Sequence, residues 1–326
     1  MAVYNLAGTI TVEPGSGSDV IVEVTRGGRD ADRLRIETGQ VRGKNALRVV
    51  YPDGDIVYAG GRDDRARGWS GSWNTEMSIN DDGTWGGAGR WNGRRRVRVK
   101  SRGDGTEAWA DIRILVPAGK SLDVNLGVGR LDARGVNADL RLDVSSARVT
   151  ASGTRGSLTI DAGSGGVELR DVNASTLSVD NGSGGITFSN VTGGMCSIET
   201  GSGGVKGDGI SCDGVRVSTG SGGVELDAVR SQDTNVDTGS GGIRINLLTA
   251  PRSLRIDAGS GSVVVGLPAT TSAEVDIDTG SGGIDTDFGL VMNKYERNRL
   301  RGRIGSGTGR IQIETGSGSV RMMKRS

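Results

Sequence analysis

Two sets of side chains in this 326-residue sequence could carry out chemistry, and the residue types in both favour binding over bond cleavage. The first set is a series of carboxylates that recur about every 19 residues, namely Asp161, Asp180, Glu199, Asp237, Asp257 and Asp278. The second set combines tryptophans and arginines, namely Trp69, Trp73, Trp85, Trp91, Arg94, Arg95 and Arg96. The sequence has no histidine, so it lacks the usual general base and the commonest metal ligand. We therefore expect that the protein is not an enzyme.

The regular spacing of the carboxylates predicts that they stack in one column across neighbouring strands. Stacked carboxylates repel one another unless a cation, a basic side chain or water separates them. Calcium bound by these oxygens is one interpretation. A solvated column that keeps the face soluble is the other, and we favour it because the Gly-Gly-x-Gly-x-Asp pattern of calcium-binding β-rolls is absent. We expect no cofactor, with calcium as the alternative.

The tryptophans and arginines interleave in a polar stretch that a short connection between strands would not need. Tryptophan and arginine dominate protein interfaces, and both can stack on sugars. This set therefore predicts a surface that binds a protein or a glycan. The alternative is that the tryptophans cover an open face or end of the fold. We expect no nucleic-acid partner, because the net charge is only +1 and no nucleic-acid-binding module is visible.

A repeated cassette indicates the elements that position both sets. Gly-Ser-Gly-Gly followed by Val or Ile begins at residues 163, 182, 201, 220 and 239, at intervals of 19. Apolar residues alternate on both sides of each cassette, as in Leu158, Ile160, Val167 and Leu169, which is typical of strands with one buried face. A fixed period of this size predicts a parallel β-solenoid of about 19-residue coils, with the glycines at its corners.

The repeat divides the chain into two parts. Residues 118–326 are predicted to form the solenoid, whose last coil begins at Gly316 after an insertion around residues 293 to 303. Residues 1–117 have a looser alternation of apolar residues and are predicted to form a β-rich part that caps or continues the solenoid. Residues 53–93 are an irregular excursion rich in tryptophan and arginine. The predicted fold class is therefore all-β.

The two cysteines do not by themselves predict a disulfide. Cys196 and Cys212 sit three residues apart in their repeats, which is about 10 Å along a strand. That is too far for a disulfide unless a corner shifts the register, so we interpret both as small packed or surface residues. No apolar run is long enough to span a membrane, and no signal peptide precedes Val3. We expect an exported protein whose signal peptide is absent from this sequence.

The repeats have the form Leu-x-Ile-Asp-Thr/Ala-Gly-Ser-Gly-Gly-Val-x-Leu, and they are preceded by Asn5-Leu6-Ala7-Gly8-Thr9-Ile10 and by Val116-Pro117-Ala118-Gly119. With these motifs the chain resembles the bacterial "putative adhesin" family of β-strand-repeat proteins, a domain of unknown function. The resemblance implies an exported parallel β-solenoid and transfers no site residues. The leading hypothesis is a non-enzymatic surface scaffold that binds a protein or glycan. The alternatives are end-to-end self-association and a polysaccharide-active β-helix enzyme.

Overall fold

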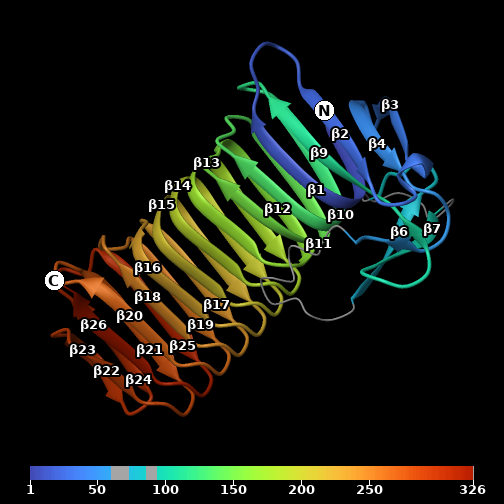
Figure 1. The fold of residues 1–326 in the computed structure, drawn as a ribbon. Coiled ribbons are helices and arrows are strands. Elements are labelled where there is room, and N and C mark those ends of the chain that lie inside the picture. Colours follow the sequence, from blue (N-terminus) through green and yellow to red (C-terminus); the bar gives the residue numbers. More distant parts are fainter. Residues whose placement is uncertain (60–72, 86–93, 326) are drawn as a thin grey trace. The chain divides into compact units, whose positions relative to one another are not determined.

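The computed structural model describes residues 1–59, 73–85 and 94–325, which form two compact units (Figure 1). Unit 1 comprises Met1–Gly156 and Ile160–Ser164, and unit 2 comprises Ser157–Thr159 and Gly165–Ser326. The described residues are almost entirely β-strand, with one short 3-10 helix, which confirms the predicted all-β class. No helix among them has the length and apolar character to cross a membrane. The predicted boundary after residue 117 stays a prediction.

The described residues of unit 1 contain eleven complete strands and the 3-10 helix η1, and β12 (Arg155–Ser164) contributes residues to both units. These elements are β1 (Ala2–Pro14), β2 (Ile21–Gly27), η1 (Ala31–Arg33), β3 (Arg35–Val41), β4 (Lys44–Val50), β5 (Ile56–Val57), β6 (Asn74–Asn80), β7 (Arg94–Lys100), β8 (Thr106–Glu107), β9 (Trp109–Val116), β10 (Ser121–Arg134) and β11 (Asp139–Ser152). A separate four-stranded sheet has the order β6-β7-β5-β8.

Strand β1 is the centre of the larger sheet of unit 1. It runs parallel to β10 on one edge and to β4 and then β9 on the other. β10 runs parallel to β11, while β2 and β3 are antiparallel to β9 and β4. The first seven residues of β1 are all buried, so both of its faces are covered. This burial accounts for its nearly continuous apolar sequence, since a strand covered on both faces cannot alternate with polar residues.

The one polar side chain in that buried run is satisfied by hydrogen bonds. The Asn5 amide donates to the carbonyl oxygen of Ala110 at 2.7 Å, and the Tyr51 hydroxyl donates to Asn5 Oδ1 at 2.8 Å. Burial raises the pKa of Tyr51 far above its usual range, so the hydroxyl keeps its proton and stays a donor. Tyr51 thus fixes the end of β4 against β1, and the loop that follows it begins from a rigid position.

Unit 2 begins with three 15-residue strands and continues with shorter ones. They are β13 (Val167–Asn181), β14 (Ile186–Thr200), β15 (Val205–Thr219), β16 (Val224–Arg230), β17 (Asp233–Thr238), β18 (Ile243–Leu247), β19 (Ser253–Ala258), β20 (Val263–Pro268), β21 (Ala273–Thr279), β22 (Ile284–Thr286), β23 (Val291–Glu296), β24 (Arg299–Ile304), β25 (Gly309–Thr315) and β26 (Val320–Arg325). Parallel partners from β13 to β18 lie 19 residues apart, as in Ile186 with Val205, except where the register shifts and pairs Val229 with Leu247.

The predicted inward positions form the core of unit 2. Val205, Val224 and Ile243 stack as one column and are each at most 2% exposed, while the next residue of each strand faces outward. Burying such a column removes apolar surface from water in every coil, at about 25 cal/mol per Å². The prediction of alternating inward and outward side chains is therefore confirmed for these strands.

A buried polar column supports the glycine corners from inside. The Thr219 hydroxyl donates to the carbonyl oxygen of Gly203 at 2.9 Å and accepts from the amide of Gly222 at 3.0 Å. Thr200 and Thr238 repeat this arrangement in neighbouring coils, and Asn181 fills the same role with its amide group. Each hydroxyl satisfies backbone groups that the turn leaves unpaired and that would be costly to bury alone. The sequence analysis did not identify this role.

The C-terminal coil is not the last one in space, which corrects the expectation from the sequence. β25 lies between β19 and β21, and β26 lies between β20 and β22, each in parallel register. The hairpin of β23 and β24 instead pairs with the outer edge of β21, in antiparallel orientation. All coils share one repeat pattern, so the pattern alone does not say where the final coil inserts. Ser272 stabilises the crossing, since its hydroxyl accepts from the amide of Gly307 at 2.9 Å.

Candidate functional sites

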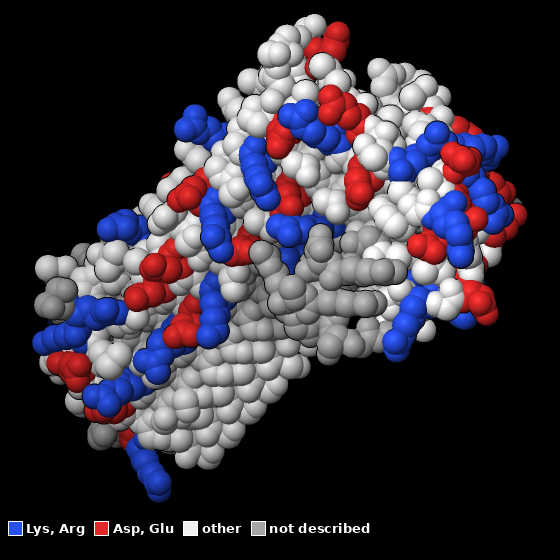
Figure 2. All heavy atoms as spheres, viewed as in Figure 1, with Lys and Arg blue, Asp and Glu red and all other residues white. Residues whose placement is uncertain are grey.

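A polar pocket of unit 1 has a volume of about 530 Å³ and is lined by three arginines. Arg33 ends η1, Arg35 begins β3, and Arg95 comes from β7, about 60 residues later. On the face shown in Figure 2, basic and acidic side chains gather over the part of unit 1 that holds β3, β4, β6 and β7. We call this the arginine pocket; its lining residues are Arg33, Arg35, Val50, Tyr51, Pro52, Asp53, Asp81 and Arg95.

Two of the three arginines are held in place by other groups. The guanidinium of Arg95 binds the Asp53 carboxylate through Nη1 and donates to the carbonyl oxygen of Tyr51 through Nη2 at 2.5 Å. Arg33 donates to the Thr106 hydroxyl at 3.0 Å. Arg35 is more open, with its side chain 70% exposed and Glu37 at 3.6 Å. The pocket is therefore lined by two arginines that hydrogen bonds hold in place and by one exposed arginine, and guanidinium groups are strong donors to an anion.

Arg95 is the predicted binding residue that the structure places in this pocket. Arg96 points to the other face of β7, with its side chain 82% exposed and Glu76 at 3.3 Å. Arg94 pairs with Asn80 through the backbone of β7, and its side chain is outside the described residues. Trp69 and Trp91 also lie outside the described residues.

The sequence analysis missed Arg33 and Arg35. Both are exposed and flank Leu34, which is 1% exposed, so local alternation could have identified them as outward-facing. Nothing in the local pattern indicates that they meet Arg95, because that encounter depends on the path of β4 and β7 between them.

The two described tryptophans of the predicted set are covered rather than displayed. Trp85 is 7% exposed, and its ring meets the edge of Tyr4 with ring centroids 5.7 Å apart. Trp73 is half-buried beside Tyr58, at 6.5 Å between ring centroids. Trp85 and Tyr4 line a 240 Å³ pocket together with Ala2, Val41, Arg42, Lys44, Asp123, Asn125, Arg141 and Asp143. Trp85 therefore packs against Tyr4 of β1, and both its predicted binding role and the alternative, that the tryptophans cover an open face or end of the fold, stay predictions.

In unit 2 the predicted carboxylates lie at paired positions of neighbouring strands and so form a column. Asp180 pairs with Glu199, and Asp237 pairs with Asp257, with Ser218 between the two pairs. Glu314 follows Asp257 in space and Asp278 comes last, because β25 inserts before β21. Asp161 belongs to unit 1. Within the described part of the chain, no three acidic or cysteine side chains gather closely enough to hold a metal ion. Calcium binding stays a prediction.

The column affects the ionisation of Asp257. Partial burial, together with the neighbouring carboxylates of Asp237 and Glu314, raises the pKa of Asp257. The folded state therefore binds this proton more tightly than the unfolded state. The contribution of Asp257 to the free energy of unfolding is therefore most favourable at or below the ordinary aspartate pKa of about 4, and it is lost as the pH rises through the folded-state pKa.

We expect Asp257→Asn to stabilise the protein at pH 7, because it removes a charge that its neighbours repel. The gain should be below about 1 kcal/mol, the scale of a cross-strand pair, and should vanish near pH 4. Urea unfolding at both pH values measures it, with Asp213→Asn as the control, since Asp213 is exposed and outside the column. A loss of stability at pH 7 would contradict this, and stabilisation of the native protein but not the variant by calcium would identify a bound cation.

An open groove of about 490 Å³ also crosses four coils of unit 2. Its floor is the fourth corner position, occupied by Gly204, Gly223, Gly242 and Ser262. Lys206 and Glu225 lie beside it and approach within 3.5 Å of each other. The lining contains no aromatic residue, and two of its three charged residues, Lys206 and Glu225, pair with each other, so it offers few groups to recognise a ligand.

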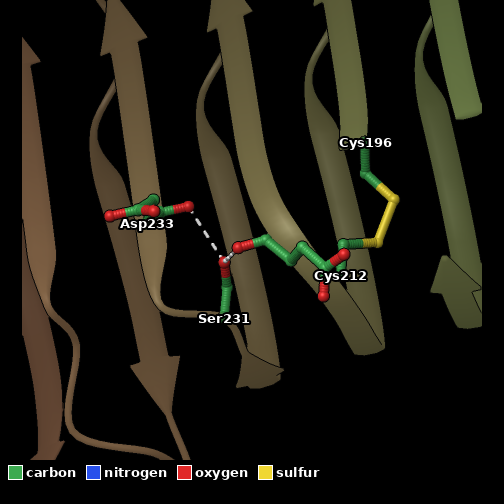
Figure 3. Close-up of a disulfide and its surroundings, with 5 residues drawn as sticks. Cys196, Cys212, Ser231 and Asp233 are labelled. Carbon is green, nitrogen blue, oxygen red and sulfur yellow. Dashed lines mark hydrogen bonds between the residues drawn. A yellow bond between two sulfur atoms is a disulfide. The ribbon is translucent and has the colours of Figure 1, made fainter. Parts of the chain in front are cut away.

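The two cysteines form a disulfide, which corrects our interpretation of them as unpaired residues (Figure 3). Cys196 and Cys212 lie on β14 and β15, with their Cα atoms 6.2 Å apart. Both strands bend here. The register pairs Gly193 with Cys212 and Met195 with Gly214, and the residues between them, Gly194 and Asp213, are not paired. Because of this bend, the side chains of Cys196 and Cys212 meet in the interior despite their three-residue offset, and they are 0% and 4% exposed. In the next coil Ser231 occupies the position of Cys212 and donates to the carbonyl oxygen of Asp233 at 2.9 Å.

Comparisons with known proteins place the larger part of this chain in a family. Residues 109–322, more than half of the chain, match the family described as Toastrack DUF4097. The chain belongs to the Toastrack DUF4097 family. The sequence resemblance to an adhesin-labelled domain of unknown function is thereby confirmed. The Toastrack match contains the carboxylate column and the disulfide, whereas every residue of the arginine pocket precedes it.

One solved structure also aligns with this Toastrack chain. It is a crystal structure described as a "putative cell adhesion protein" from Clostridium sporogenes ATCC 15579, at 12% sequence identity and a TM-score of 0.19, covering 99% of this chain and 89% of the other. A comparison with curated proteins finds no match.

Proposed function

We propose that this protein is an exported, non-enzymatic β-solenoid of about 19-residue coils that acts as an adhesin-like scaffold. It binds a protein or glycan partner through unit 1, at the arginine pocket and the adjoining excursion of residues 53–93. The observation that carries the proposal is the meeting of Arg33, Arg35 and Arg95 from distant parts of the sequence. Arginines that converge on a pocket provide directional recognition, whereas isolated surface arginines do not.

The disulfide supports an exported location. Disulfides persist in oxidising compartments and are rare in a reducing cytosol. Cys196 and Cys212 are both deeply buried, so their pairing is part of the folded core of unit 2. A core built on a disulfide would be weakened in a reducing compartment.

A role without catalysis is supported by the acidic and basic groups present. The chain has no histidine, and the carboxylates of the column lie along one strand register instead of converging on a pocket. Acid and base catalysis by two carboxylates needs environments that separate their pKa values strongly. A column of equivalent positions does not readily create such a difference.

The order of strands at the C-terminal part of unit 2 disfavours end-to-end assembly. The hairpin of β23 and β24 occupies the edge of β21 with antiparallel hydrogen bonds. β22, the strand next to β26, has only three residues, which is a common way to limit edge pairing.

An array of surface glycans and surface proteins tests the proposed function. The intact chain is compared with the double variant Arg33→Ala/Arg35→Ala and with the control Arg170→Ala/Arg310→Ala, which removes two exposed arginines from unit 2. We expect at least one bound partner whose signal is lost only in the first variant. Absence of any bound partner, or equal signals from both variants, would contradict binding through this pocket.

A further inference from the structure

We propose that the arginine pocket binds a saccharide unit that carries a carboxylate, of the kind found in polyuronate chains. This inference rests on the proposed binding function and specifies its ligand. The pocket volume of about 530 Å³ falls within the usual range for small-molecule sites, so it can enclose a short stretch of such a chain. All of its lining residues belong to unit 1.

The three arginines account for recognition of the carboxylate. A guanidinium group presents two parallel N–H donors that match the two oxygens of a carboxylate, which an ammonium group cannot do. Arg95 is 19% exposed and is already oriented by Asp53 and Tyr51. The Nε atom of Arg95 is buried and has no hydrogen-bond partner among the described residues. Preorganised donors lose little conformational entropy when the ligand arrives.

The two aspartates of the pocket account for the sugar. Asp53 is 93% exposed although it contacts Arg95, and Asp81 is exposed in the turn after β6. Ionised carboxylates only accept hydrogen bonds, so they suit the hydroxyl groups of a saccharide. Sulfate and an acidic peptide bring negative charge without hydroxyl groups that could donate to these aspartates, so their repulsion by Asp53 and Asp81 is not offset as it is for a saccharide. A ligand with one acid group surrounded by hydroxyls fits this mixture of donors and acceptors.

Arg35 is the residue that completes the site when the ligand binds. Its side chain is 70% exposed, compared with 19% for Arg95, and its ion pair among the described residues is with Glu37, at 3.6 Å. An exposed ion pair of this geometry is weak and exchanges readily for a better partner. Because Arg35 supports no buried structure, its replacement changes the site without endangering the fold.

Calorimetric titration of the full chain with a galacturonate tetrasaccharide tests the inference. The comparison probes are the same tetrasaccharide with its carboxyl groups reduced to alcohols, inorganic sulfate, and a short polyglutamate peptide. We expect binding of the uronate alone, weakened by salt. Arg35→Ala should lower the affinity about tenfold or more, Arg35→Lys should lower it less, and Arg170→Ala/Arg310→Ala should leave it unchanged. Asp81→Asn should weaken uronate binding and strengthen sulfate binding.

Equal affinity for the reduced tetrasaccharide, or for polyglutamate, would overturn the assignment to an acidic saccharide. An unchanged affinity in Arg35→Ala, with circular dichroism confirming the fold of the variant, would overturn the assignment to this pocket. If the chain does not bind the uronate but binds another array partner, and if that binding requires Arg33 and Arg35, only this inference is contradicted. A chain that binds nothing on the array contradicts the proposed function itself.

Discussion

Replacing Gly222 by alanine should lower the free energy of unfolding by about 3 kcal/mol. A Cβ atom at Gly222 would lie 1.9 Å from the carbonyl oxygen of Gly203 in the preceding coil. The clash is with backbone, and that backbone is itself held by the Thr219 hydroxyl at 2.9 Å. Neither side can move without breaking the ladder between coils, so the cost should exceed that of an ordinary overpacked core position.

Gly223 provides a matched control one residue away. A Cβ atom there would have its closest contact at 3.3 Å, with the carbonyl oxygen of Gly242, and serines occupy the equivalent position at Ser262 and Ser319. Gly223→Ala should therefore cost less than about 1 kcal/mol. All five tryptophans precede residue 110, so urea unfolding should be followed by far-ultraviolet circular dichroism and by hydrogen exchange of β14 to β16. Equal losses in the two variants would contradict steric stacking of the third corner glycine.

Removing the disulfide should cost about 3 kcal/mol, the chain-entropy value for a 16-residue separation. The most suitable variant is Cys196→Val/Cys212→Ala. Val215 stands at the position of Cys196 in the next coil, and Ala174 stands at that of Cys212 two coils earlier, so both replacements fit the local packing. The loss should therefore report the cross-link and not a cavity.

A reducing agent gives an independent measurement of the same effect. Dithiothreitol should lower the urea midpoint of the native chain to that of the double variant and should leave the variant unchanged. If the urea midpoint of the native chain does not change although free-thiol labelling shows both cysteines reduced, the expected stabilisation by the disulfide is contradicted. If dithiothreitol leaves the urea midpoint unchanged and labelling finds no free thiols, the bond has not been reduced. Free thiols are therefore labelled in each sample.

The repeated half of the chain was predictable because its local pattern and its packing agree. Inward residues such as Val205 and Val224 recur every 19 positions, and a strand with a period of two can bury only one set of them. Gly222 was predictable as a corner residue for the same reason. Its stacking on Gly203 and the threonine that braces it follow from geometry that only adjacent coils create.

The predictions that failed depend on where segments meet. The disulfide was missed because residue spacing measures distance along a straight strand, whereas the corner bends both strands between Cys196 and Cys212. The insertion of β25 and β26 was missed because every coil has nearly the same edge, so the repeat is compatible with several spatial orders. Short loops and hydrogen bonds such as those of Ser272 select one of these orders.

The candidate site likewise combines a feature that the sequence predicts with one that only the tertiary structure shows. Residue type alone indicated that arginines near the excursion could bind a partner, because guanidinium chemistry does not depend on the fold. Which arginines act together depended on the tertiary structure, which joins Arg95 to Arg33 and Arg35. Local periodicity reports the direction in which a side chain points. Convergence of residues 60 positions apart requires the path of every strand between them, and the sequence pattern does not encode that path in any one place.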